Sequence, residues 1–308
     1  MLTIGSRGSQ LARWQANWVK TSIEALGEEC RIEIIHTTGD KITDVALSKV
    51  GTKGLFTKEI EEALLDQRID LAVHSLKDMP TELPAGLILA AIPAREDPRD
   101  ALVGRRLADL PKGARVGTSS LRRAAQLRAI RPDLTIENIR GNLDTRLRKL
   151  DEQQYDAIVL ASAGLRRLGW ADRITELLDP EVMCPAVGQG ALAVETRDSG
   201  RARDVCALLD HALTRTAVFT ERAVLARLGG GCQVPIGAHA TVSDGRTVHL
   251  RAVVVSPDGA SVIRKQASGP VDRFEQLGRE TGDALLAEGG RQILEAVYGS
   301  SADASLRK

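Results

Sequence analysis

A cysteine stands at the end of a run of three glycines, in the segment 229–235, which reads GGGCQVP. Glycines bury no side chain and lose more conformational entropy on folding than other residues, so packing does not explain the run. The run lets the backbone bend and lets a bulky group come close, and Pro235 stiffens the exit. The pattern indicates that Cys232 is displayed as a nucleophile. The alternative is a buried structural cysteine beside a flexible turn.

Three other motifs place arginine beside serine or glycine at turns that lead from a predicted strand into a predicted helix. They read SRGS at 6–9, GTSSLRR at 117–123 and RGNLDTR at 140–146. Ligands of open α/β sheets bind at the carboxyl ends of the strands, where helix N-termini also attract anions. Because arginine holds carboxylates or phosphates through paired hydrogen bonds, the motifs predict a ligand with several anionic groups.

The arginines of the second motif, Arg122 and Arg123, are adjacent in the helix predicted over 119–130. Adjacent side chains of a helix point about 100° apart, so we do not expect the two guanidiniums to share one surface ion pair. In the first turn of the helix, however, both can flank a ligand from different sides. Taken alone, the motif fits equally a capped surface helix whose arginines are solvated.

A lysine and an aspartate, Lys77 and Asp78, follow the apolar run 70–73, which is predicted to be a buried strand. The topology places this strand end beside Arg7. A lone carboxylate among cations stays ionised, so Asp78 is suited to stabilise a positive intermediate or to transfer protons. The alternative is a surface ion pair, which contributes little to stability. His74, in the same segment, is interpreted as a structural residue.

The elements that carry these motifs alternate between strand and helix, which predicts mostly parallel sheets covered on both faces. A charged, proline-punctuated segment at 93–100 interrupts the pattern and predicts a hinge. The pattern then restarts, and an apolar run at 191–194 returns to the first unit, giving two hinge crossings. A helix, alternating strands and two further helices follow. We predict three domains, namely 1–95 with 190–211, 96–189, and 212–308.

Composition excludes several classes of protein. The 308 residues are 43% hydrophobic and 27% charged, with a net charge of +1 and 3% aromatic residues, so no overall field attracts nucleic acid or an anionic membrane. No apolar run is long enough to span a bilayer, and the N-terminus is too short and too polar for a signal peptide. The four cysteines are scattered, without metal-ligand spacing, which argues against a zinc site and a disulfide framework. We expect a soluble cytoplasmic protein that binds no metal.

The chain resembles porphobilinogen deaminase, also called hydroxymethylbilane synthase. The motifs that carry the resemblance are the segments 73–80, 116–123, 140–142 with Thr145 and Arg146, 185–190 and 230–235. They occur in that family's order and cover nearly the whole chain. Two positions depart from the family pattern: Ser6 stands where Thr is expected, and Gly229 stands where an acidic residue is common. Neither removes a catalytic group, although Gly229 puts the stiffness of the cysteine loop in doubt.

The resemblance implies an α/β fold with two domains like those of periplasmic binding proteins around a cleft, and a small α+β C-terminal domain. It implies a transferase of haem biosynthesis that condenses four porphobilinogen molecules with loss of ammonia. Water then releases the linear tetrapyrrole hydroxymethylbilane. The growing chain is built on a dipyrromethane cofactor, which Cys232 holds through a thioether bond. The cofactor comes from the enzyme's own substrate, and each pyrrole ring carries two carboxylates.

The resemblance also assigns roles within the cleft. Asp78 faces the pyrrole nitrogens, stabilises developing positive charge and assists proton transfer. The cofactor's carboxylates are held by Lys77, Ser120, Arg122 and Arg123. The incoming substrate and the growing chain are bound by Arg7, Ser9, Lys53, Arg140, Arg146, Arg167 and Gln189. Segment 43–53, poor in apolar residues, is expected to be a mobile lid. We expect a monomer, and the resemblance leaves open a hand-off of the product to the next enzyme of the pathway.

Two other functions are weighed against this one. A non-enzymatic, two-lobed polyanion-binding protein explains the arginine motifs and the hinge but gives no role to Cys232 or Asp78. A nucleic-acid-binding protein would use the same arginines, but the net charge, the scarcity of aromatic residues and the lack of a recognition motif oppose it.

Overall fold

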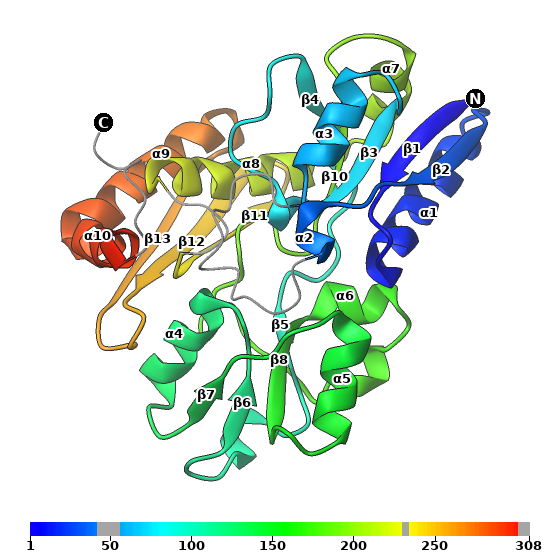
Figure 1. The fold of residues 1–308 in the computed structure, drawn as a ribbon. Coiled ribbons are helices and arrows are strands. Elements are labelled where there is room, and N and C mark those ends of the chain that lie inside the picture. The colour runs from blue at the N-terminus through cyan, green and yellow to red at the C-terminus, as the bar shows by residue number, and fades with distance from the viewer. Residues whose placement is uncertain (42–55, 230–233, 301–308) are drawn as a thin grey trace.

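Three β-sheets organise the chain, as the computed structural model shows for residues 1–41, 56–229 and 234–300 (Figure 1). The first sheet has the strand order β2-β1-β3-β10-β4 and the second the order β7-β6-β8-β5-β9. The third sheet is a meander of three antiparallel strands, β11-β12-β13. The predicted fold class, two α/β units and a small α+β unit, is confirmed.

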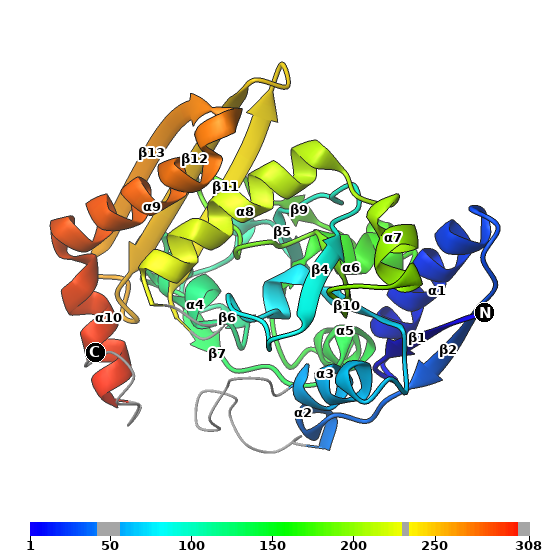
Figure 2. The ribbon, with the colours of Figure 1, turned by 90° about the horizontal axis from the view of Figure 1, so that it is seen from above.

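The first sheet consists of β1 (Leu2–Ser6), β2 (Cys30–Ile34), β3 (Leu71–Ser75), β4 (Leu87–Ala91) and β10 (Leu192–Arg197), with helices α1 (Gln10–Glu24), α2 (Thr38–Lys41), α3 (Lys58–Leu65) and α7 (Arg201–Ala207). The second sheet consists of β5 (Asp100–Val103), β6 (Arg115–Gly117), β7 (Thr135–Glu137), β8 (Ala157–Ala161) and β9 (Glu176–Leu177), with helices α4 (Leu121–Ile130), α5 (Leu143–Asp151) and α6 (Ser162–Arg167). The third unit consists of α8 (Ala212–Arg227), β11 (Ile236–Ser243), β12 (Thr247–Val255), β13 (Val262–Pro270), α9 (Phe274–Leu285) and α10 (Arg291–Ser300). Figure 2 shows α8 and α9 lying across one face of the third sheet.

Both α/β sheets are mostly parallel, as expected, but each contains one antiparallel strand. Strand β10 runs antiparallel to β3 and β4, and β5 runs antiparallel to β8 and β9. Strands β5 and β10 are each the first strand that the chain forms after it crosses from one sheet to the other. A strand that enters from the other unit needs no crossover helix, so nothing forces it to be parallel to its neighbours.

The two crossing segments lie side by side between the α/β units. The Glu96 backbone N–H donates to the Gly190 carbonyl oxygen, with an N···O distance of 3.2 Å. Gly190 has a φ of +87°, and a Cβ there would lie 2.3 Å from the Glu96 carbonyl oxygen. Only glycine fits both the left-handed backbone and this close approach. The pairing makes the hinge a two-stranded connection whose geometry is defined.

Helix α8 fastens the third unit to both crossing segments. The Glu221 carboxylate is completely buried and accepts from both Nη atoms of Arg95, at 2.6 and 3.2 Å. It also accepts from the backbone N–H groups of Gly188 and Ala240, at 2.7 and 2.8 Å. Every contact is charge-assisted, which is the condition under which a buried ion pair is stable. One carboxylate therefore joins the hinge, α8 and the third sheet.

We propose the domain division 1–95 with 190–211, 96–189, and 212–308, which the separate sheets and cores support. A core of Leu2, Ile4, Leu71 and Val194 lies behind the first sheet, and a separate core built on Leu102, Val116 and Leu127 lies in the second unit. Val248, Leu250 and Leu285 belong to a third core under α8 and α9. Among the described helices, none has the length and apolar character needed to traverse a bilayer.

Candidate functional site

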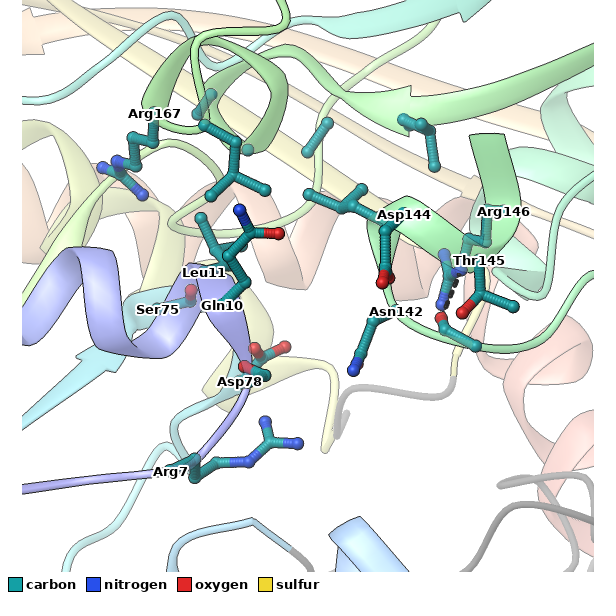
Figure 3. A pocket seen from close by; sticks show the side chains of 18 of the residues that line it. Arg7, Gln10, Leu11, Ser75, Asp78, Asn142, Asp144, Thr145, Arg146 and Arg167 are labelled. Carbon is teal, nitrogen blue, oxygen red and sulfur yellow. Dashed lines mark hydrogen bonds between the residues drawn. The ribbon is translucent and has the colours of Figure 1, made fainter. Parts of the chain in front are cut away.

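A cavity of about 930 Å³ is lined by residues of both α/β units (Figure 3). Figure 3 shows Arg7 and Asp78 on one side and Asn142, Thr145 and Arg146 on the other. Among its described lining residues, seven are lysines or arginines and two are aspartates. The cations are Arg7, Lys77, Arg123, Arg140, Arg146, Lys149 and Arg167, and the carboxylates are Asp78 and Asp144.

The first unit presents its polar side chains at the carboxyl ends of β1 and β3. Arg7 follows β1 and lies over the Phe56 ring, 4.2 Å from its centroid. Ser9 caps α1, accepting from the Ala12 N–H at 3.3 Å. Lys77 and Asp78 lie in a short 3₁₀ turn directly after β3. The cavity is thus lined where strand ends and helix N-termini meet, which is the usual ligand-binding edge of such sheets.

Two contacts hold the turn that carries Asp78. Before it, the His74 imidazole meets the Glu195 carboxylate at 3.0 Å, both buried, which joins β3 to β10 and agrees with the structural interpretation of His74. After it, the Arg222 guanidinium of α8 donates to the carbonyl oxygens of Pro80 and Thr81, at 2.5 and 3.2 Å. Asp78 itself is exposed. Its carboxylate thus stands on a fixed backbone and faces the cavity.

The second unit presents its cations after β7 and β8. Arg140 follows β7, and Arg146 lies in the first turns of α5, where its Nε donates to the Gly141 carbonyl oxygen at 2.8 Å. Arg167 ends α6, where its Nη2 donates to the Gly190 carbonyl oxygen at 2.6 Å and its guanidinium lies 5.9 Å from the Trp14 ring centroid. Arg167 therefore touches the hinge and helix α1 of the opposite unit.

Burial and mutual repulsion act on these cations. Burial, with Arg123 and Arg140 nearby, lowers the pKa of Arg146 to about 10. Burial likewise lowers the pKa of Arg167 to about 10, although Glu96 opposes the shift. Desolvation lowers the pKa of the Lys77 ammonium, and the neighbouring Asp78 carboxylate opposes it. Cations that are desolvated and close together are stabilised when an anionic ligand binds among them.

Arg122 and Arg123 do not diverge, which corrects the expectation that they flank a ligand from two sides. Both donate to the buried carboxylate of Asp100, Arg122 through Nη1 at 2.7 Å and Arg123 through Nε at 2.9 Å. Only Arg123 is among the residues that line the cavity. The two side chains can meet because Asp100 lies in the protein interior rather than on the helix surface.

Two other predicted residues lie behind the cavity wall. The Ser120 side chain caps α4, accepting from the Arg123 N–H at 3.5 Å. The buried Gln189 side chain donates to Asp100 at 2.9 Å and to the Pro98 carbonyl oxygen at 2.7 Å. Neither is among the lining residues. Lys53, Cys232 and the segment 43–53 lie outside the described residues.

Three residues of the site are missed by sequence reasoning. Asp100 reads as part of the charged hinge segment but begins β5. Phe56 lies three residues after the polar stretch 43–53, and its contact with Arg7 joins parts of the chain that are distant in sequence. Lys149, one helical turn after Arg146, lines the cavity from α5, and this spacing of three residues is a signal that could have identified it.

Comparison with known proteins decides the family. The family model "Porphobilinogen deaminase, dipyromethane cofactor binding domain" matches residues 2–204, and "Porphobilinogen deaminase, C-terminal domain" matches residues 215–287. The chain belongs to the porphobilinogen deaminase family. The deaminase of Syntrophobacter fumaroxidans is 53% identical over 304 residues, covering 97% of this chain and 98% of its own. The deaminase of Pelobacter propionicus is 54% identical over 302 residues, covering 96% of this chain and 97% of its own.

Among solved structures, the methionine-binding protein MetQ aligns with 68% of this chain and 89% of its own, at 12% identity and a TM-score of 0.43. The two porphobilinogen deaminase family models together take in all three sheets of the chain.

The cavity fits the cofactor named in the family description. A dipyrromethane with acetate and propionate arms carries four carboxylates, and the described lining offers seven cations against two aspartates. Arginine and lysine are the side chains suited to bind such groups. The excess of cations also leaves room for the carboxylates of further pyrrole rings. Among the described residues, no cluster of His, Cys, Asp and Glu side chains is arranged to hold a metal ion.

Replacing Arg146 by glutamine is expected to raise the KM for porphobilinogen by about tenfold, because a hydrogen bond to a charged group contributes about 1.5–3 kcal/mol. Arg148→Gln is the matched control, because Arg148 lies in the same helix but is exposed and outside the cavity lining. Steady-state kinetics on both variants measure the effect. Equal KM values for the two would show that Arg146 does not bind substrate.

Proposed function

We propose that the chain condenses four porphobilinogen molecules head to tail on a covalently held dipyrromethane and releases hydroxymethylbilane, and so has hydroxymethylbilane synthase activity in haem biosynthesis. One observation carries the proposal. In a chain of this family, an exposed aspartate, Asp78, shares one cavity with the seven cationic side chains of its described lining. A polyanion-binding protein needs the cations but not the carboxylate.

Asp78 would serve the bond-breaking step. The substrate's aminomethyl C–N bond breaks and ammonia leaves, while the pyrrole nitrogen supplies the electron pair and becomes positive. The Asp78 carboxylate stabilises this charge at the N–H of the ring. When a new C–C bond has formed, the ring carbon loses its proton and aromaticity returns. Asp78 is placed to accept that proton.

The cations would hold the carboxylates of the pyrrole rings. The dipyrromethane, when bound, supplies the nucleophilic α-carbon to which the first substrate is joined. We assign its carboxylates to Lys77 and Arg123, which line the cavity, with Ser120 and Arg122 behind them. We assign substrate and growing chain to Arg7, Ser9, Arg140, Arg146 and Arg167. Lys53, Gln189 and the attachment through Cys232 stay predictions from the resemblance.

The proposal extends to the oligomeric state, the binding partners and the cellular compartment. We propose a monomer whose partner is its small-molecule substrate, with hand-off of the product to the next enzyme left open. We place it in the cytoplasm, because Cys30, Cys184 and Cys206 are free, buried thiols, as in a reducing compartment.

The test is to incubate the purified protein with porphobilinogen and to measure ammonia and hydroxymethylbilane. Four ammonia molecules per tetrapyrrole are expected, since each condensation breaks one C–N bond. Tight binding of porphobilinogen without ammonia release would instead favour the two-lobed polyanion-binding protein.

A further inference from the structure

The buried carboxylate of Asp100 is the centre of a hydrogen-bonded cluster that the proposed mechanism does not use. Oδ1 accepts from Arg123 Nε at 2.9 Å, Gln189 Nε2 at 2.9 Å and Arg122 Nη2 at 3.2 Å. Oδ2 accepts from Arg122 Nη1 at 2.7 Å. Desolvation acts to raise the pKa of the Asp100 carboxyl, but the two guanidiniums outweigh it and hold the pKa well below its usual range. Asp100 is therefore an anion in the fold.

The cluster fixes the Arg123 side chain from several directions. Besides Asp100, Nη1 donates to the Val159 carbonyl oxygen at 3.1 Å, and Nη2 lies 3.4 Å from the Gln189 side-chain oxygen. A guanidinium has five N–H donors in a rigid plane. Bonds at all three nitrogens prevent the plane from turning, and within the described parts of the chain they leave one N–H of Nη1 without a partner. Arg123 is thus held in one orientation at the cavity wall.

Arg122 is held differently. It is 4% exposed, its Nη1 also donates to the Cys184 carbonyl oxygen at 2.5 Å, and it is not among the lining residues. Because Arg122 and Arg123 share the single carboxylate of Asp100, the cluster carries an excess positive charge behind the cavity wall. Removing Asp100 would leave both guanidiniums buried without a counter-charge, so each would be free to reorient.

We propose that Asp100 is a positioning residue for the cofactor site, which fixes the Arg123 guanidinium toward the cavity, with Arg122 acting through Asp100. The inference rests on the proposed function, since Arg123 is assigned to the cofactor's carboxylates. It also gives a reason for the position of Asp100 at the first residue of β5. The same strand that enters the second unit from the hinge brings in the anion that orients the cation.

The test compares Asp100→Asn with Glu221→Gln in the full chain. Both carboxylates are completely buried and arginine-paired, but Arg95, the partner of Glu221, does not line the cavity. Intact mass gives the fraction of purified chains that carry dipyrromethane, and thermal unfolding gives stability. We expect both variants to lose stability, while only Asp100→Asn lowers the loaded fraction, by about tenfold, as for loss of a hydrogen bond to a charged group. Equal loading losses in the two variants would overturn the proposal.

Two further variants keep the test decisive if Asp100→Asn does not fold. In Asp100→Asn/Arg122→Met, the excess buried cation is removed, so stability should recover while loading stays low. In Asp100→Glu, the charge is kept but displaced by one methylene, so the protein should fold and again load poorly. Full loading in either folded variant would show that Asp100 is only structural. Wild-type protein, measured in parallel, must carry the cofactor; a bare polypeptide mass there would refute the proposed function itself.

Discussion

Asp78→Asn is expected to retain its covalent cofactor and to lose turnover by about 10²–10⁴-fold, the range contributed by a positioned acid or base. Asparagine preserves the size of the side chain, and the turn is held from outside by the His74–Glu195 contact and by Arg222. The cations assigned to the cofactor remain in place. What is lost is the negative charge that stabilises the positive ring nitrogen and accepts the proton of the ring carbon. The rate of hydroxymethylbilane formation and the intact mass measure the two effects separately.

The matched control is Asp144→Asn, because Asp144 is the second carboxylate of the described cavity lining. It lies in the first turn of α5, where a carboxylate stabilises the helix N-terminus. We expect this variant to lose much less activity than Asp78→Asn. A near-normal rate in Asp78→Asn, or equal losses in the two, would contradict the role of Asp78.

Local signals explain why so much of the cavity could be predicted from the sequence. Arg7, Asp78 and Arg140 come shortly after strands. In βαβ units the carboxyl ends of the strands lie at the same edge of the sheet, so these residues are expected at that edge. The same rule places Arg123 at the cavity wall. Arg167 ends helix α6 and is predicted only by the resemblance. Hence residues from four separate turns could be assigned to one cavity before their contacts were known.

Contacts between distant segments explain what the sequence does not reveal. Asp100 resembles its charged neighbours in the hinge segment, and its burial depends on two arginines more than twenty residues later. Helix geometry predicts that Arg122 and Arg123 point apart and do not share one ion pair. That prediction applies to a partner on the helix surface, and Asp100 is instead a buried partner. The single antiparallel strand of each α/β sheet has the same origin, because β5 and β10 arrive from the opposite unit. These features depend on tertiary packing, which periodicity does not report.

The three described cysteines are poor candidates for carrying a covalent group, which sharpens the prediction for Cys232. All three are buried, and burial raises the pKa of Cys184 and of Cys206 to about 12. Burial also raises the pKa of Cys30. The thiolate is the nucleophilic form of cysteine, so these thiols are protonated and inert at neutral pH. Cys232, which lies outside the described residues, is left as the thiol that the sequence predicts to be a displayed nucleophile.

Cys232→Ser is therefore expected to give a protein whose intact mass equals that of the bare polypeptide and which forms no hydroxymethylbilane. The hydroxyl of serine is a far weaker nucleophile than a thiolate, so the tether does not form. Without a tether, condensation has no fixed starting ring beside Asp78, and the effective concentration that a bound reactant provides is lost. The matched control is Cys30→Ala, which should load fully because Cys30 is buried at the far strand of the first sheet. A loaded mass in Cys232→Ser would mean that another residue carries the cofactor, and the role of the glycine-flanked thiol would have to be abandoned.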